Sequence, residues 1–276
     1  MIRLGYTESQ LLFYYYLDKH TTFDKKLYEE RQNDLINWFY SVSGFYDKTV
    51  SGIYFNFDAN YIKNTVIYNK YFEKVLKNIK NINNCKIKLN FHNIDMDHIP
   101  QKLKDEFYNY LNINNKITKY PDVFSFMSNK KILIINNLSS LMKQQYDSGN
   151  VKQICPDFPD DVINIKCFEN GYTFFNTGPN KNILQTYRKM CHKIKEIDFD
   201  GAIISAGAYS SLLAYHISTK LKKEVYVCGG ELPNYFGIKT NYAYMYNKYL
   251  INEYWIPVPE DMKPPNYKKI EDGIYW

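Results

Sequence analysis

Two glycine-containing turns between Asp200 and Lys239 have the residue types that suit phosphate or nucleotide binding. The apolar run Ala202–Ser205 predicts a buried parallel strand, and Ala206-Gly207-Ala208 follows it as a turn without bulky side chains. A second predicted strand, Val225–Cys228, ends in Gly229-Gly230. Because open α/β sheets bind ligands outside the carboxyl ends of their strands, both turns are predicted to border one crevice. Backbone N–H groups at the start of the intervening helix favour an anion there.

The spacing of these glycines excludes two common nucleotide motifs. It is not G-x-G-x-x-G, and no acidic residue ends the second strand to hold a ribose, which disfavours a dinucleotide dehydrogenase. The chain also lacks a G-x-x-x-x-G-K-[ST] loop, which disfavours a P-loop kinase or ATPase. The alternative that the glycines only form turns stays open on spacing alone.

The elements that must position these turns alternate along the chain. Strands are predicted at 2–5, 86–91, 131–136, 162–166, 202–205 and 225–228, and helices at 7–17, 25–40, 61–80, 97–111, 139–146 and 181–196, with a further helix after Ser210. Strands that alternate with helices predict a mostly parallel, Rossmann-like α/β sheet flanked by helices. We expect one compact domain in two halves, 1–128 and 129–276. The proline-rich tail is predicted to wrap the body, with Trp255, Tyr275 and Trp276 as apolar anchors.

Composition and charge narrow the class of protein. The 276 residues can bury a sizeable core, and the net charge of +6 is interspersed with acids, so nucleic-acid binding is not expected.

Five scattered cysteines form no C-x-x-C pair, which indicates a reducing compartment. His216 and Cys191 are expected to be structural. No apolar run of about 18 residues and no leader pattern is present, so a cytoplasmic protein without a transmembrane segment is predicted.

Several motifs, strongest at the two ends of the chain, resemble a family from polysaccharide gene clusters that is related to GT-D-type glycosyltransferases. They are Arg3-Leu4-Gly5-Tyr6-Thr7-Glu8, Ser43-Gly44-Phe45-Tyr46, Asn129–Ile135 with Gln145-Tyr146, Phe199-Asp200 through Gly207-Ala208-Tyr209, Gly229-Gly230 with Phe236-Gly237-Ile238-Lys239, Asn252-Glu253-Tyr254-Trp255 with Pro257, and Glu271–Trp276. The resemblance covers most of the chain. It implies a GT-D-like fold and transfer of a sugar from a nucleotide-sugar donor to a glycan acceptor.

The resemblance also implies roles for particular residues. Glu8 would be the catalytic base or the ligand of a Mn²⁺ or Mg²⁺ ion, because a divalent cation on a diphosphate takes one or two protein carboxylates. The nucleotide sugar would be bound by Arg3, Gly5, Gly207, Ala208, Tyr209, Gly229, Gly230 and Lys239. Structural alternatives remain for two of them: Arg3 suits a surface ion pair and Glu8 suits helix capping. Tyr209 suits packing as well as stacking on a base or sugar.

Three departures from the family pattern leave the activity open. Tyr6 stands where the first acid of the family's acidic pair is expected, Glu231-Leu232-Pro233-Asn234 replaces a segment with a glutamine, and Lys239-Thr240-Asn241 lacks two of the family's cationic side chains. A catalytically degenerate nucleotide-sugar-binding or partner protein of a glycan pathway is therefore the alternative to an active glycosyltransferase. A third alternative is an enzyme that uses a nucleotide sugar without transferring the sugar. The sequence leaves homo-oligomer formation open.

Overall fold

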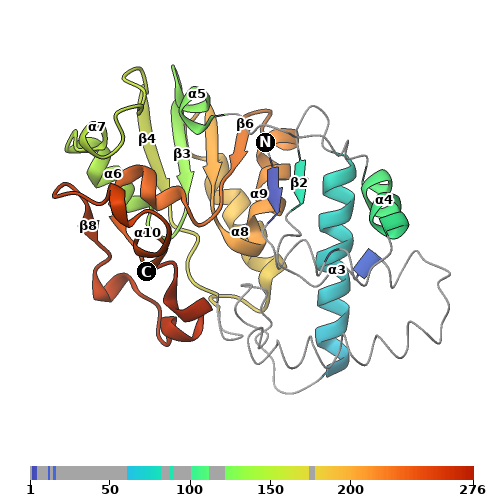
Figure 1. The fold of residues 1–276 in the computed structure, drawn as a ribbon. Helices are drawn as coiled ribbons and strands as arrows, with labels where there is room; N and C mark the ends of the chain where they lie inside the picture. The colour runs from blue at the N-terminus through green and yellow to red at the C-terminus, as the bar shows by residue number, and fades with distance from the viewer. Residues whose placement is uncertain are drawn as a thin grey trace.

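A four-stranded parallel sheet forms the centre of the protein (Figure 1). The computed structural model describes residues 2–4, 12, 15–16, 61–81, 87–89, 101–111, 122–173 and 178–276. The sheet strands are β3 (Lys131–Ile135), β4 (Asn164–Phe168), β5 (Gly201–Ile204) and β6 (Glu224–Val227), in the spatial order β4-β3-β5-β6. In the register of the sheet, Ile134 of β3 pairs with Cys167 on one side and Ile203 on the other. The predicted parallel α/β sheet is confirmed at this level.

Helices connect consecutive strands, as the alternating pattern predicted. The connecting helices are α6 (Ser139–Asp147) and α7 (Val151–Ile154) between β3 and β4, α8 (Ile183–Lys195) between β4 and β5, and α9 (Ser210–Tyr215) between β5 and β6. A 3-10 turn, η2 (Gly207–Tyr209), precedes α9, and a π-helical turn, η3 (His216–Lys220), follows it. This π turn was not predicted, because such turns are rare and occur as single turns inside helices.

Both faces of the two central strands, β3 and β5, are buried, which explains why these strands are apolar without alternation. In β3, Leu133 and Ile135 belong to a core with α3, α8 and α9, while Ile132 and Ile134 belong to a second core with α5, α6 and the tail. In β5, Ile204 belongs to the first of these cores and Ile203 to the second. Successive side chains of a strand point to opposite faces, so the helices form one layer on each side of the sheet.

The described elements before Asp122 pack against one of these layers. They are β1 (Ile2–Leu4), which pairs in parallel with β2 (Ile87–Leu89), and the helices α3 (Tyr61–Lys80) and α4 (Gln101–Tyr110). β1 contacts β6 and α9, and α3 contacts α9 (Figure 1). Buried side chains of α3, including Tyr71 and Val75, belong to the same core as Leu133 of β3. Core residues of both halves therefore form one continuous cluster.

A five-residue helix, α5 (Val123–Met127), precedes β3 and was not predicted. Its start is fixed by Asp122, whose carboxylate accepts hydrogen bonds from the N–H groups of Phe124 and Ser125. This is N-capping, which satisfies N–H groups that have no partner inside the helix. A helix of five residues is too short to show a hydrophobic period, so only the cap could have revealed it.

The tail beyond β6 consists of short elements. They are η4 (Leu232–Phe236), β7 (Ile238–Lys239), α10 (Asn241–Tyr246), η5 (Lys248–Leu250), β8 (Ile256–Pro257), η6 (Glu260–Met262), η7 (Tyr267–Lys269) and η8 (Glu271–Gly273). Trp255 and Trp276 are buried and Tyr275 is half-buried against the second core. Within the described ranges, no helix is long and apolar enough to cross a membrane.

Candidate functional site

The strand order reverses between β3 and β5, whose carboxyl ends lie side by side at the same edge of the sheet. From β3 the chain moves to β4 on one side, and from β5 it moves to β6 on the other side. Ligands of open α/β sheets bind at such a switch point, because the two connections diverge and leave a crevice between them. We therefore take the turns after Ile135 and Ile204 as the candidate site.

Polar side chains tie the three strand ends together at this edge. Asn136 donates from Nδ2 to the carbonyl oxygen of Ser205 at 2.8 Å, and its Oδ1 accepts from the N–H of Leu138 at 2.8 Å. Ser205 in turn donates from Oγ to the carbonyl oxygen of Gly229 at 3.0 Å. These bonds fix the ends of β3, β5 and β6 relative to one another. The turns at this edge are thus held in place by hydrogen bonds.

Two asparagines next to Asn136 carry buried acceptors. Asn137 and Asn170 both donate from Nδ2 to the carbonyl oxygen of Gly171, at 3.3 and 3.2 Å. The Oδ1 atom of each is buried and accepts no hydrogen bond from the described residues. Leaving a buried acceptor unpaired costs about 1–3 kcal/mol, so such atoms call for an explanation. A ligand hydroxyl or N–H group would satisfy both.

The turn after β5 is held by its neighbours on both sides. Gly207 is exposed and has φ of +51°, a conformation that favours glycine. The N–H of Ala206 donates to Oγ of Ser210 at 2.9 Å, and the hydroxyl of Tyr71 donates to the carbonyl oxygen of Ala208 at 2.7 Å. α3 thus helps to position this turn. Gly207 is the part of the turn that faces outward.

Ala208 and Tyr209, also predicted as binding residues, lie inside the protein. Tyr209 is 2% exposed, and its hydroxyl lies 3.4 Å from Oγ1 of Thr173. Ala208 is 1% exposed. The ring of Tyr209 therefore contributes packing, and a base or sugar would reach only the backbone of this turn.

The second glycine turn lies under the C-terminal tail. A Cβ atom on Gly230 would meet Cε1 of Tyr275 at 2.8 Å and Cδ2 of Tyr242 at 3.6 Å. The tail is fixed here, because the N–H of Tyr242 donates to the carbonyl oxygen of Ile274 at 2.7 Å. Close approach of the Tyr275 ring accounts for the glycine at 230. Gly229, whose carbonyl oxygen binds Ser205, lies one residue nearer to the sheet.

Glu271 is a site candidate that the sequence did not single out. Its carboxylate accepts a hydrogen bond from the Tyr275 hydroxyl at 2.6 Å, so it lies one ring away from Gly230. Burial raises the pKa of Glu271 above its ordinary value of 4.5, and the bond from Tyr275 partly opposes this shift. A carboxyl with a raised pKa is suited to proton transfer if a ligand binds next to it. Only the tertiary contact between the tail and Gly230 reveals it.

The raised pKa of Glu271 predicts a pH dependence of stability. The folded state binds this proton more tightly than the unfolded state, so the stabilisation is complete below pH 4.5 and is lost as pH rises through the raised folded pKa. Glu271→Gln is expected to remove this loss and to make the protein more stable than wild type at neutral pH. Urea unfolding between about pH 4 and pH 8 measures the effect. Asp272→Asn, at an exposed neighbour, is the control; equal pH profiles for wild type and Glu271→Gln would contradict the prediction.

Of the remaining predicted site residues, the structure describes Lys239 and the backbone of Arg3. Lys239 is half-buried on β7, where it pairs with Pro257 of β8 at the start of the tail layer. The backbone of Arg3 lies in β1, next to β6. Gly5 and Glu8 lie outside the described residues, so their placement stays a prediction. No group of three or more His, Cys, Asp or Glu side chains in the described part of the chain could hold a metal ion, and the expected Mn²⁺ or Mg²⁺ rests on Glu8.

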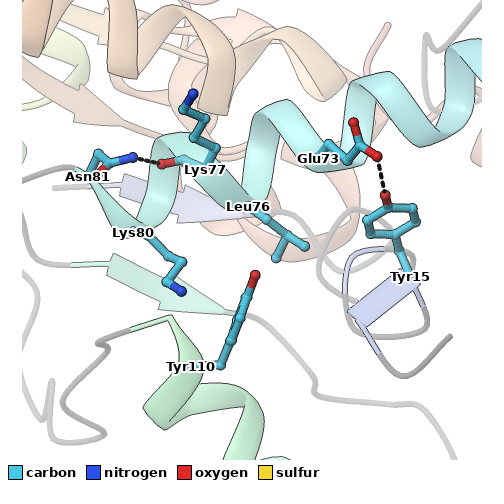
Figure 2. A pocket seen from close by; sticks show the side chains of 7 residues that line it. All are labelled: Tyr15, Glu73, Leu76, Lys77, Lys80, Asn81 and Tyr110. Carbon is cyan, nitrogen blue, oxygen red and sulfur yellow. Dashed lines mark hydrogen bonds between the residues drawn. The ribbon is translucent and has the colours of Figure 1, made fainter. Parts of the chain in front are cut away.

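A separate hollow of about 510 Å³ lies on α3 (Figure 2). Its described lining residues are Tyr15, Glu73, Leu76, Lys77, Lys80, Asn81 and Tyr110. Figure 2 shows Tyr15 donating to Glu73, at 3.2 Å, and Lys80 reaching toward Tyr110, with Nζ 3.8 Å from the ring centroid. Of the predicted site residues that the structure describes, none lines this hollow. Lys77 and Lys80 point in different directions in Figure 2, so the two cations do not converge on one point.

Burial shifts the titratable side chains between α8 and α9 toward their uncharged forms. Burial raises the pKa of the Cys191 thiol to about 11, which keeps it protonated and poorly nucleophilic at neutral pH. Burial likewise lowers the pKa of His216, which therefore stays neutral in the π turn. A Cys–His nucleophile at this place is thereby disfavoured.

Comparison of the chain with protein-family models, with curated proteins and with solved structures finds no match. Function must therefore be argued from the site itself.

Proposed function

We propose that this protein is a Rossmann-like, GT-D-type glycosyltransferase that transfers a sugar from a nucleotide-sugar donor to a glycan acceptor. The glycan would belong to a surface polysaccharide or a glycoprotein. The observation that carries the proposal is the polar edge at the carboxyl ends of the strands, which holds the Gly207 turn after β5 and, after β3 and β4, two buried asparagine acceptors that accept no hydrogen bond from the described residues. Because nucleotide sugars are substrates of the cell interior, the proposal includes a cytoplasmic location.

The parts of the substrate can be assigned to parts of this edge. The exposed Gly207 turn offers close backbone approach to the diphosphate at the start of the η2–α9 segment. Oδ1 of Asn137 and of Asn170 would accept from hydroxyls of the sugar or the ribose. Arg3 and Lys239 would offset the phosphate charge, and Glu8 would hold a Mn²⁺ or Mg²⁺ ion or act as the base toward the acceptor. Glu271 is a second carboxyl near Gly230 for the same proton transfer.

A catalytically degenerate nucleotide-sugar-binding or partner protein is the second candidate. One observation favours it: the Tyr275 ring fills the space beside Gly230 that a phosphate would otherwise approach. In that case the Gly207 turn and the two asparagines would still bind the ligand, but no transfer would follow. Product analysis separates this candidate from an active transferase and from an enzyme that uses a nucleotide sugar without transfer.

A thermal-shift screen of nucleotides and nucleotide sugars, each with and without Mn²⁺ or Mg²⁺, tests the proposal. A ligand at about a hundred times its dissociation constant stabilises the folded state by about 2.7 kcal/mol, so we expect a clear rise in Tm with at least one nucleotide diphosphate sugar. The shift should fall when Asn137 and Asn170 are both replaced by alanine. Asn81→Ala, in the hollow of Figure 2, is the matched control and should leave the shift unchanged.

Two results would contradict the proposal. If no nucleotide sugar raises the Tm, the protein does not bind a nucleotide-sugar donor and the proposal is wrong. A shift that depends on Asn81 instead of Asn137 and Asn170 would move the ligand from the sheet edge to the hollow on α3.

A further inference from the structure

Exposed apolar side chains gather on one short segment of the tail. Seven large hydrophobic side chains are markedly exposed in the described chain, and six of them lie between Tyr244 and Tyr254, with Ile163 as the exception. Tyr249 is 82% exposed and Met245 is 63% exposed. Single exposed apolar residues are normal, but a contiguous group marks an interaction surface. The segment lies at the edge of the molecule far from α3 and α4 (Figure 1).

The backbone of this segment is anchored, so its side chains are held outward. Ala243 at one end and Trp255 at the other are buried in a small core with Ile154. Oγ1 of Thr240 caps α10 by accepting from the N–H of Ala243, and Nε2 of Gln145 donates to the carbonyl oxygen of Tyr254 at 2.8 Å. The outward position of the tyrosines is therefore built into the fold.

The chemistry of the surface fits another protein better than a lipid. Tyrosine and methionine are enriched at protein interfaces, where tyrosine adds contact area and a hydroxyl. Lys248 and Glu253 are the charged residues from Tyr244 to Tyr254, and both are exposed. Neither forms an ion pair with the described part of its own chain. Because their charges cancel, the surface lacks the excess of cations that attracts anionic headgroups.

We propose that the surface from Tyr244 to Tyr254 binds the same surface of a second copy of this chain. In a two-fold interface, if residue i of one subunit contacts residue j of the other, residue j of the first subunit also contacts residue i of the second. A surface with one cation and one anion is therefore complementary to itself. Lys248 then pairs with Glu253 of the partner subunit, twice per dimer, at the rim of an apolar centre formed by residues such as Tyr246, Tyr249 and Leu250. This inference does not depend on the proposed function.

Sedimentation velocity over about 1 to 100 µM protein tests the dimer. We expect wild type to approach twice the chain mass of 32.9 kDa and Tyr246→Ser with Tyr249→Ser to raise the dissociation constant about tenfold or more. Ile163→Ser, at the exposed apolar residue outside the surface, is the control and should dimerise as wild type does. Thermal unfolding of each variant verifies that it is folded.

A charge exchange tests the orientation. Lys248→Glu and Glu253→Lys should each weaken the dimer, and the double variant should restore it. A wild type that stays monomeric at every concentration would overturn the proposal, as would a dimer that none of these variants affects. A monomer that sediments with phosphatidylglycerol–phosphatidylcholine vesicles would also overturn it and would assign the surface to lipid.

Discussion

Replacing Gly237 by alanine is expected to lower the free energy of unfolding by about 3 kcal/mol. Gly237 ends η4 with φ of +68°, a conformation that costs a residue with a Cβ about 1–2 kcal/mol. The added Cβ would also lie 2.5 Å from Cδ1 of Ile154, and overpacking of this kind costs about 1–3 kcal/mol. Because the Gly237 carbonyl oxygen accepts from the N–H of Ile256 at 2.9 Å, the contact between β7 and β8 should loosen as well. Urea unfolding measures the loss.

Gly149→Ala provides a matched control for this prediction. Gly149 has φ of +77°, and nothing lies within 4 Å of its missing Cβ, so alanine there should cost only the backbone strain, about 1–2 kcal/mol. The difference between the two variants isolates the packing conflict. Ile154→Ala should reduce the additional cost of Gly237→Ala, because it removes the atom that the Cβ would meet. Equal losses for Gly149→Ala and Gly237→Ala would refute the packing explanation.

Glu8→Gln is expected to leave the fold intact and to abolish sugar transfer. The amide keeps the size of the side chain but neither accepts a proton nor binds a divalent cation as a carboxylate does. Loss of a general base lowers the rate by about 100- to 10,000-fold. The measurement is release of the nucleoside diphosphate from the donor that the thermal-shift screen identifies.

The matched control for Glu8→Gln is Glu196→Gln, which removes an exposed carboxylate at the end of α8, near the amino end of β5. Transfer should be unchanged in this variant. Retained turnover in Glu8→Gln would exclude Glu8 from the mechanism. Glu271→Gln would then become the decisive variant, because Glu271 is the described carboxyl beside Gly230.

The sequence by itself determined the sheet strands and the longer helices of the second half of the chain. The apolar runs at 131–136 and 202–205 predicted β3 and β5 within one or two residues, because strands buried on both faces show their environment in every side chain. The period of 181–196 likewise predicted α8. The glycine at 207 was correctly read as a turn with little bulk, and its positive φ gives the reason. Strands, helices and turns like these depend on residues that are close in sequence, so the local sequence pattern predicts them.

Only the tertiary structure decided which of these elements meet. It set the order β4-β3-β5-β6 and so placed the switch point beside Asn136, which no local pattern encodes. It buried Tyr209, and it brought Tyr275 from the end of the chain onto Gly230, so that Gly230 lies in packing contact with the tail. It also left the tyrosines after Ala243 exposed although their composition matches that of buried segments. These outcomes depend on contacts between residues far apart in sequence, where burial is decided by the partner surface and not by residue type.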